Sequence, residues 1–142
     1  MENYHTYNEI KSQTQAWAQA LDVVNASPSP KAGDYDQVIF TGCGSTYYLS
    51  LAAAALYTEL TGRSARAVPG GELLLNSQTV LTSQKTLLVA ISRSGTTTET
   101  VKAVEKYKQE KRGDVVVISN YDEILSTAFT VSVVVRTADG DQ

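Results

Sequence analysis

The stretch Leu87–Ile91 (LLVAI), followed directly by Ser92–Glu99 (SRSGTTTE), decides the fold of this 142-residue chain. An unbroken apolar run of this length indicates a strand that is buried on both faces of a sheet. A helical pattern follows the hydroxyl-rich turn, so the turn lies at a helix N-terminus. Free backbone N–H groups and the positive end of the helix dipole gather there, and the stretch therefore predicts an anion site.

The same arrangement occurs once earlier in the chain. Val38–Thr41 (VIFT) reads as a buried strand, and Gly42–Thr46 (GCGST) is the turn that leads into the next helical pattern. Glycines and small hydroxyl residues let an anion approach the backbone closely. Two such turns on one sheet predict a phosphate pocket with room for an attached polar group.

Outward from these turns, strands and helices alternate. Strands are expected at 37–41, 64–68, 86–91, 114–119 and 130–136, and helices at 45–61, 72–76 and 97–111, with one or two helical turns at 122–128. Gly113 stands where a cap for the 97–111 helix is expected. The alternation predicts an α/β fold: a three-layer αβα sandwich with a five-stranded, parallel, doubly wound sheet. Both turns then lie beyond the carboxyl ends of the strands, where such sheets bind ligands.

The N-terminal segment predicts an amphipathic helix that precedes this fold. Its apolar residues recur at helical spacing, and the two prolines of Ala26–Lys31 end the pattern. We therefore expect a helical extension at residues 1–30 and a single domain at residues 31–142. The apolar residues of the extension are Tyr7, Ile10, Trp17, Leu21 and Val24.

Composition excludes several classes of function. The chain has 12 Lys and Arg against 15 Asp and Glu, a net charge of -3, which argues against a nucleic-acid-binding surface. Cys43 is the only cysteine, so an internal disulfide and a cysteine-based zinc site are excluded, and we expect no metal. No apolar run is long enough to span a membrane, and the first residues do not form a leader, so we expect a cytoplasmic protein.

Other phosphate-binding motifs match poorly, and we expect no cofactor. The turn at Gly42 fits only part of the dinucleotide fingerprint, because Tyr47 stands where the third glycine is needed. The Gly-Lys-Ser/Thr sequence of a P-loop is absent. A phosphatase loop with Cys43 as nucleophile needs a nearby arginine to hold the phosphate, and residues 44–50 contain none.

Three charged residues near the two turns can be interpreted either as structural or as functional. Thr96–Glu99 fits a capping box, so Glu99 is assigned to the start of the helix. Arg93 pairs either with a phosphate or carboxylate of a ligand or with a structural partner. Glu72 either begins a short helix or faces the pocket.

The two turns together resemble those of the sugar isomerase (SIS) domain family. The likeness covers about residues 5–136. It is greatest to the first SIS domain of the isomerase half of glucosamine-6-phosphate synthase, and to ketose/aldose phosphate isomerases and amino-sugar deaminases. Arg93 replaces a glutamine of the synthase, which favours the isomerase and deaminase branch or a less characterised relative. The resemblance implies a flavodoxin-like fold that binds sugar phosphates, usually 6-phosphates.

Site residues follow from the resemblance at matching positions. Ser92, Ser94 and Thr97 contact the phosphate, and the backbone of Arg93 and Gly95 adds to that turn. The sugar side is lined by residues of the first turn, with the hydroxyls of the last two near sugar oxygens. These residues are Cys43, Gly44, Ser45 and Thr46.

The chain departs from the family in length. Enzymes of the family usually carry two SIS domains, and their catalytic base, ring-opening histidine or Schiff-base lysine lies in the second half or a partner subunit. No position here matches those groups. Glu72 and Glu99 are the only carboxylates near the expected pocket; neither suits a base, and Glu72 is kept as a weak candidate. Whether the chain alone is an enzyme is left open.

We therefore expect the N-terminal half of a sugar-phosphate isomerase or amino-sugar-phosphate deaminase. It would pair with a second SIS domain or form a homo-oligomer, with the apolar face of the N-terminal helix as a candidate contact. Two alternatives stay open: a non-catalytic sugar-phosphate sensor, and a structural half that completes a partner's site.

Overall fold

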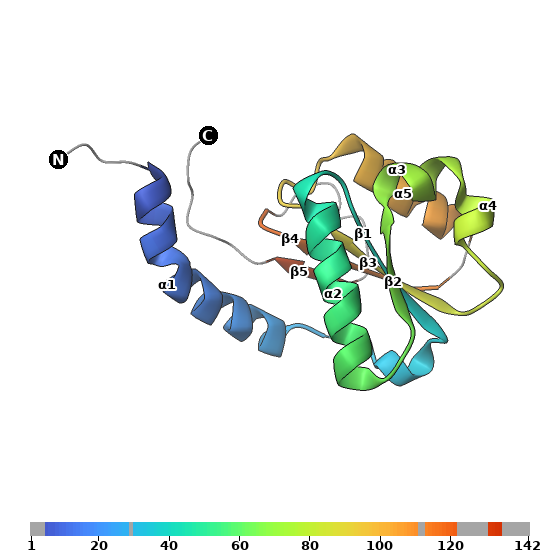
Figure 1. Cartoon of the computed structure of the whole chain (residues 1–142), viewed down its shortest axis with the longest axis horizontal. Helices are drawn as coiled ribbons and strands as arrows, with labels where there is room; N and C mark the ends of the chain where they lie inside the picture. Colours follow the sequence, from blue (N-terminus) through green and yellow to red (C-terminus); the bar gives the residue numbers. More distant parts are fainter. Residues whose placement is uncertain (1–4, 29, 111–112, 122–130, 135–142) are drawn as a thin grey trace.

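The computed structural model describes residues 5–28, 30–110, 113–121 and 131–134 (Figure 1). Along the chain, helices and strands alternate from the second helix onward. The elements are α1 (His5–Ala26), the 3-10 helix η1 (Ala32–Asp34), β1 (Gln37–Gly42), α2 (Ser45–Thr61), β2 (Ala65–Pro69), α3 (Gly70–Leu75), α4 (Ser77–Val80), β3 (Thr86–Ile91), α5 (Thr98–Gln109), β4 (Val115–Ser119) and β5 (Val131–Val134).

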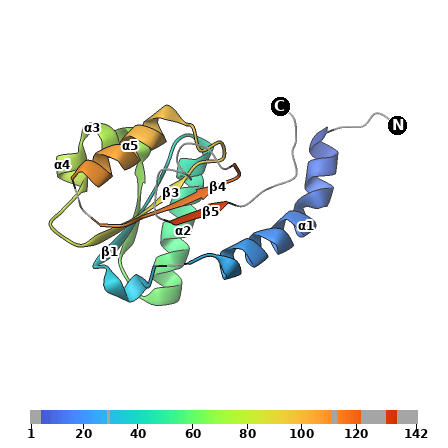
Figure 2. The same ribbon diagram turned by 180° about the vertical axis from the view of Figure 1, so that it is seen from behind.

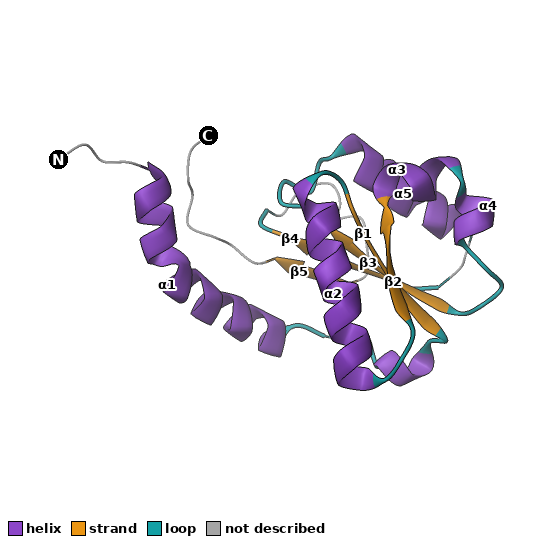
Figure 3. Cartoon of the chain, in the orientation of Figure 1, coloured by secondary structure: helices purple, strands orange, loops and turns teal. Residues whose placement is uncertain are grey.

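The strands form one five-stranded sheet in the order β2-β1-β3-β4-β5, and every neighbouring pair is parallel. This is the flavodoxin-like order, and its direction reverses between β1 and β3. Helix α2 lies on one face of the sheet, and α3, α4 and α5 lie on the other (Figures 1 and 3). The predicted three-layer sandwich and its five parallel strands are confirmed.

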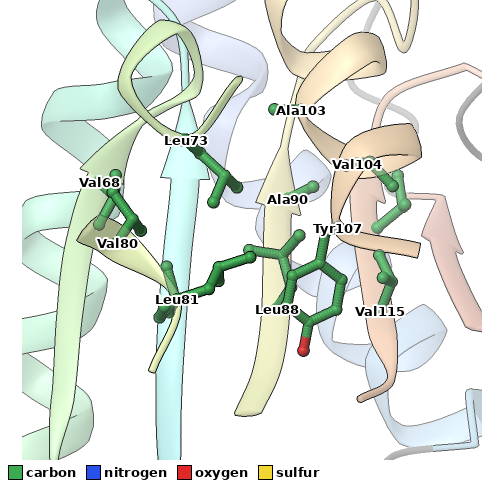
Figure 4. Close-up of a cluster of buried hydrophobic side chains, with 12 residues drawn as sticks. Val68, Leu73, Val80, Leu81, Leu88, Ala90, Ala103, Val104, Tyr107 and Val115 are labelled. Atoms are coloured by element: carbon green, nitrogen blue, oxygen red, sulfur yellow. The ribbon is translucent and has the colours of Figure 1, made fainter. Parts of the chain in front are cut away.

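Two apolar clusters hold the layers together. Alternate residues of β1 show the division, because Ile39 joins the cluster beneath α3, α4 and α5, whereas Val38 and Phe40 join the cluster beneath α2. All positions of β1 and β3 are buried, which explains why both strands read as apolar runs. Figure 4 shows the first cluster, in which the fully buried Tyr107 of α5 donates a 2.5 Å hydrogen bond to the carbonyl oxygen of Thr86.

Gly113 does not cap α5. The C-cap of that helix is Glu110, so the expectation of a glycine cap was wrong. Gly113 is required for another reason: its φ is 147°, and a Cβ atom there would overlap the carbonyl oxygen of Thr86. The tight approach of this residue to β3 leaves no room for a side chain.

Other boundaries differ from the expectation by one or two residues. Helix α3 begins at Gly70, and β2 runs to Pro69. The short helix α4 and η1 were missed, because three or four residues carry too little periodicity to detect. The expected helical turns at 122–128 lie outside the described residues.

Helix α1 extends away from the body of the domain. Both views show it joined to the rest only at its C-terminal end (Figures 1 and 2). Val23, near that end, packs against the cluster beneath α2, and α1 approaches β5. Within the described residues, no helix combines the length and apolarity needed to cross a membrane.

Candidate functional site

Three helices begin at the edge of the sheet where β1 and β3 end. Helix α2 follows β1, α3 follows β2, and α5 follows β3 after the turn at residues 92–97. Because the strands are parallel and their order reverses between β1 and β3, this edge lies at the switch point where doubly wound sheets bind ligands. Both turns singled out in the sequence are therefore brought to one place.

The first turn is closed by Thr46. Its Oγ1 accepts a 2.9 Å hydrogen bond from the backbone N–H of Cys43 and donates one of 2.9 Å to the carbonyl oxygen of Cys43. Gly42 makes this closure possible, since a Cβ there would lie 2.6 Å from Thr46 Oγ1. Gly44, the N-cap of α2, has a φ of 58°, a conformation that favours glycine.

The hydroxyl groups of Ser45 and Thr46 thus differ in whether they are free to bind a ligand. The hydroxyl of Thr46 is used within its own turn, whereas Ser45 is exposed and its hydroxyl makes no hydrogen bond with a described residue. Cys43 is half-buried at the base of the turn. Of the two hydroxyls expected near a sugar, that of Ser45 is open to solvent.

The second turn is organised around Ser92, which is buried. Its Oγ accepts a 3.1 Å hydrogen bond from the N–H of Gly95 and lies 3.4 Å from Thr97 Oγ1. Ser94 Oγ in turn accepts hydrogen bonds from the N–H and the hydroxyl of Thr96, at 3.2 and 3.1 Å. The hydroxyls of the motif therefore lie together on a tight turn, with a φ of 69° at Gly95.

The backbone fixes this turn to the neighbouring strand. The N–H of Ser92 donates to the carbonyl oxygen of Ile118 at 3.0 Å, and the carbonyl oxygen of Arg93 accepts from the N–H of Asn120 at 3.0 Å. The turn is therefore a continuation of the β3–β4 ladder and has a defined position relative to the sheet.

Gly70 brings the start of α3 between the two turns. A Cβ at Gly70 would lie 3.5 Å from the carbonyl oxygen of Gly42 and 3.5 Å from the backbone nitrogen of Thr100 in the first turn of α5. The end of β1, the start of α3 and the start of α5 thus lie in direct contact.

The first turns of α2 and α5 lack side-chain caps. Neither N-cap, Gly44 nor Thr97, makes a capping hydrogen bond through its side chain. The capping box was a wrong prediction, because the N–H of Thr96 donates to Ser94 and not to Glu99, which is exposed. The N–H groups and positive dipole ends of two helices are consequently directed at this edge of the sheet.

The charged residues considered for the site, Arg93 and Glu72, are both exposed. Arg93 is exposed and forms no ion pair with any residue that the structure describes. Glu72 is exposed in the first turn of α3. No group of His, Cys, Asp and Glu with the spacing of a metal site occurs within the described residues.

Sequence reasoning missed two hydroxyls near these turns. Thr41, the residue before Gly42 in β1, and Thr100, in the first turn of α5, are fully buried, and their Oγ1 atoms have no hydrogen-bond partner among the described residues. The sequence did contain a usable signal for Thr41. It follows Ile39 by two positions in a strand, so both side chains lie on the face of the sheet that α3 and α5 cover.

Comparison with known proteins agrees with this geometry. The family model for the SIS domain matches residues 34–140. The D-galactosamine-6-phosphate deaminase AgaS of Escherichia coli O157:H7 is 29% identical in an alignment 113 residues long, which covers 73% of this chain and 29% of the relative.

Solved structures share the fold. The tagatose-6-phosphate ketose/aldose isomerase of Escherichia coli superposes with a TM-score of 0.76 at 21% identity, over 94% of this chain and 41% of that one. The glucosamine-6-phosphate deaminase of Thermotoga maritima gives a TM-score of 0.76 at 24% identity, over 93% and 40%.

The chain spans less than half the length of each of these three relatives. The family model nonetheless covers the whole sheet, both turns and helices α2 to α5. It leaves out α1 and most of the connection between α1 and β1. On this match, with the fold and the two turns, the chain belongs to the SIS domain family.

Proposed function

We propose that this chain binds the phosphate group of a phosphorylated sugar at the carboxyl edge of its sheet. The observation that carries the proposal is the meeting of two helix N-termini without side-chain caps, α2 and α5, at the switch point of the sheet. Backbone N–H groups and dipoles aimed at one place stabilise a dianionic group without a metal or cofactor.

The second turn supplies the phosphate contacts in this proposal. The hydroxyls of Ser94 and Thr97, which are half-buried, donate to phosphate oxygens. Ser92 Oγ accepts from the N–H of Gly95 and lies 3.4 Å from Thr97 Oγ1, and either of these two hydroxyls can be the donor between them. Arg93, which has no ion pair within the described residues, adds charge at the rim, together with the backbone of Gly95.

The first turn faces the rest of the sugar. Ser45 offers an exposed hydroxyl, while Cys43, Gly44 and Thr46 shape the wall behind it. Hydroxyl groups of this kind suit the polar substituents of a sugar, which need a partner for each donor and acceptor that binding removes from water.

We further propose that the chain acts as the N-terminal part of a ketose/aldose isomerase or an amino-sugar-phosphate deaminase. Three relatives with these activities in their names are more than twice as long as the matched region. Aldose–ketose interconversion requires a base that moves a proton between neighbouring carbons through an enediolate. Glu72 is exposed and remains a weak candidate, so the base comes from a second SIS domain or a partner subunit of a cytoplasmic assembly.

A thermal-unfolding titration tests the binding proposal. The ligands are galactosamine 6-phosphate, tagatose 6-phosphate and glucosamine 6-phosphate, with the unphosphorylated sugars and inorganic phosphate as matched controls. A ligand that binds only the folded state raises Tm with the logarithm of its concentration. We expect a rise with a sugar phosphate that exceeds the rise with phosphate alone. Equal curves for all sugar phosphates and for buffer would refute the proposal.

A further inference from the structure

Two fully buried threonines, Thr41 and Thr100, carry hydroxyl groups that the fold itself does not satisfy. Neither Oγ1 atom has a hydrogen-bond partner among the described residues. A buried hydroxyl that has given up its partners in water destabilises the folded state unless it finds a new one. Native structures therefore pair nearly all such groups, either with protein atoms or with ordered water.

Thr41 lies in an apolar row that runs across the sheet. Its register partners are Val68 of β2 and Ala90 of β3, and both belong to the cluster beneath α3, α4 and α5. Ile39, two positions earlier in β1, belongs to the same cluster. Because side chains alternate between the faces of a strand, the side chain of Thr41 lies on this face as well.

Thr100 lies on the side of α5 that faces the same cluster. It precedes Ala103 and Val104 by three and four residues, so the three side chains share one face of the helix. Both of these residues are fully buried members of the cluster. Thr100 also lies in the first turn of α5, where the backbone N–H groups have no partner within the helix.

Gly70 shows that the end of β1 and the start of α5 are close together. A Cβ atom built on Gly70 would lie 3.5 Å from the carbonyl oxygen of Gly42, the residue after Thr41, and 3.5 Å from the backbone nitrogen of Thr100. These two backbone atoms are therefore separated by at most twice that distance. The two threonines thus lie at the same end of the core, yet their hydroxyls form no hydrogen bond with each other.

We propose that one ordered water molecule lies between Thr41 and Thr100 and bridges their hydroxyl groups. The neighbours of this position have short side chains or none: Ala90 is beside Thr41 in the sheet, Ala103 is one turn after Thr100, and Gly70 approaches from α3. Figure 4 shows Ala90 and Ala103 toward the carboxyl ends of the strands. The two hydroxyls and the N–H of Thr100 give the water three partners, the usual number for a buried water.

A water molecule suits this position better than an ion. A hydroxyl group and a water molecule can each donate and accept, so all the groups can be satisfied without a charge. A buried cation needs a carboxylate to compensate its charge, and the carboxylates in the first turns of α3 and α5, Glu72 and Glu99, are exposed.

The water bridge joins the two turns of the candidate site from below. Thr41 directly precedes the first turn, and Thr100 lies in the first turn of the helix that follows the second. The bridge therefore adds a connection between β1 and α5 that the side chains alone do not make. It is independent of the proposed sugar-phosphate binding, because it lies within the core and needs no ligand.

A high-resolution crystal structure of the ligand-free 142-residue chain tests the proposal directly. We expect a buried water within about 2.5–3.2 Å of both Oγ1 atoms. The same position should hold no water in the double variant Thr41→Val/Thr100→Val. A direct hydrogen bond between the two hydroxyls, a metal ion at the position, or the absence of density between the hydroxyls would each overturn the proposal.

Thermal unfolding of valine variants gives an independent test, because the sign of the effect differs. Valine keeps the shape of threonine and replaces the hydroxyl by a methyl group. With the water in place, Thr41→Val or Thr100→Val removes one of its partners, so each should lower Tm by roughly 3 °C or more. The double variant should lose less than the sum of both, because the two hydroxyls act through one water.

Hydroxyls without any partner predict the opposite result. Replacing an unsatisfied buried hydroxyl by a methyl group is neutral or stabilising, so each valine would leave Tm unchanged or raise it. The two effects would then add, since no shared partner couples the sites. Unchanged or raised Tm values in both single variants would therefore overturn the water bridge.

Thr6→Val and Thr86→Val are the matched controls. Thr6 is exposed in α1, so its replacement should alter Tm only slightly. Thr86 is buried, and its Oγ1 accepts a 2.9 Å hydrogen bond from Gln37 and donates one of 3.0 Å to a backbone carbonyl oxygen. Thr86→Val therefore sets the scale for the loss of a satisfied buried hydroxyl.

The serine variants Thr41→Ser and Thr100→Ser separate the hydroxyl from the methyl group. Each keeps its hydroxyl and should retain the water in the crystal, even where the lost methyl group lowers Tm. Circular dichroism of every variant checks that the fold is kept. Failure of sugar-phosphate binding in the titration above would leave all of these results unchanged, so the two proposals fail separately.

Discussion

The phenol oxygen of Tyr35 donates a 2.5 Å hydrogen bond to Oδ2 of Asp114, 79 positions later in the chain. Tyr35 lies just before β1, and Asp114 lies just before β4 and accepts the N–H of Leu88 through its carbonyl oxygen. The carbonyl oxygen of Tyr35 also accepts a hydrogen bond from Arg63. These contacts connect the amino ends of strands on both sides of the switch point, at the edge opposite the candidate site.

Tyr35→Phe should lower the free energy of unfolding by about 1 kcal/mol, because Asp114 is exposed and water can replace the lost hydrogen bond. Burial, followed by the hydrogen bond to Asp114 and the charges of Asp114 and Asp34, raises the pKa of Tyr35 from 10.0 to about 12. The folded state therefore favours the neutral phenol. The stabilisation that the neutral phenol gives to the folded state is fully present below pH 10.0 and is lost as the pH rises to about 12.

Urea unfolding of wild type and Tyr35→Phe at a series of pH values checks this window. The stability difference between the two proteins should be constant below pH 10.0 and should shrink on approach to pH 12. A difference that stays the same throughout would show that the phenol does not titrate as expected.

Gly42→Ala should disturb both the fold and the site. The added Cβ would lie 2.6 Å from Thr46 Oγ1 and within 2.8 Å of the Thr46 backbone, so the start of α2 must move. We expect a loss of about 1–3 kcal/mol of stability and weaker binding of sugar phosphate. Gly71→Ala is the control, since a Cβ there meets no atom within 4 Å. It should be neutral or slightly stabilising, because alanine is the better helix former. Equal Tm values for the two variants would contradict the close contact.

Gly113→Ala should destabilise the domain without a direct effect on the site. Its Cβ would overlap the carbonyl oxygen of Thr86, an atom that already accepts the hydrogen bond of Tyr107. The strain of a φ of 147° adds to this overlap, so we expect a loss of 2 kcal/mol or more, on the order of an overpacked core. Gly33→Ala has open space around its Cβ and serves as control. Differential scanning calorimetry of both variants measures the effect, and a Gly113→Ala Tm equal to that of Gly33→Ala would disprove it.

The fold was readable from the sequence because its two central strands, β1 and β3, are buried on both faces and so consist of apolar runs. The bounds of α2 and β3 were predicted to the residue. The capping box and the Gly113 cap were wrong for a common reason. Local patterns do not reveal that Ser94 takes the N–H of Thr96, or that the carbonyl oxygen of Thr86 fills the space beside Gly113.

The placement of both turns at one edge of the sheet could be predicted from the parallel arrangement of the strands alone. The insertion of Gly70 between them could not, because it depends on how α3 packs against α5. For the same reason the buried hydroxyl of Thr100 was not recognised, whereas that of Thr41 could have been found from the alternation of residues along β1. Contacts between elements distant in the sequence leave no periodic signal.

Arg93→Met should weaken the binding of sugar phosphate while leaving stability within about 0.5 kcal/mol, as for an exposed residue without a structural partner among the described residues. The methionine keeps much of the apolar stem and removes the charge. Calorimetric titration of the best ligand at low and high salt measures the effect, since screening should reduce the wild-type affinity more than that of the variant. Undiminished affinity in Arg93→Met would assign Arg93 to another role.

Ser92→Ala should separate the organisation of the phosphate turn from the stability of the sheet. It removes the oxygen that accepts the N–H of Gly95, and it leaves that buried N–H without its partner. We expect a cost of about 1–3 kcal/mol in stability and a loss of at least about tenfold in sugar-phosphate affinity. Thr97→Ser is the informative comparison, because it keeps a hydroxyl 3.4 Å from Ser92 Oγ and should retain binding. Ser83→Ala, in an exposed loop before β3, controls for the loss of a serine elsewhere. If Ser92→Ala binds as tightly as Ser83→Ala, the phosphate is held elsewhere on the domain.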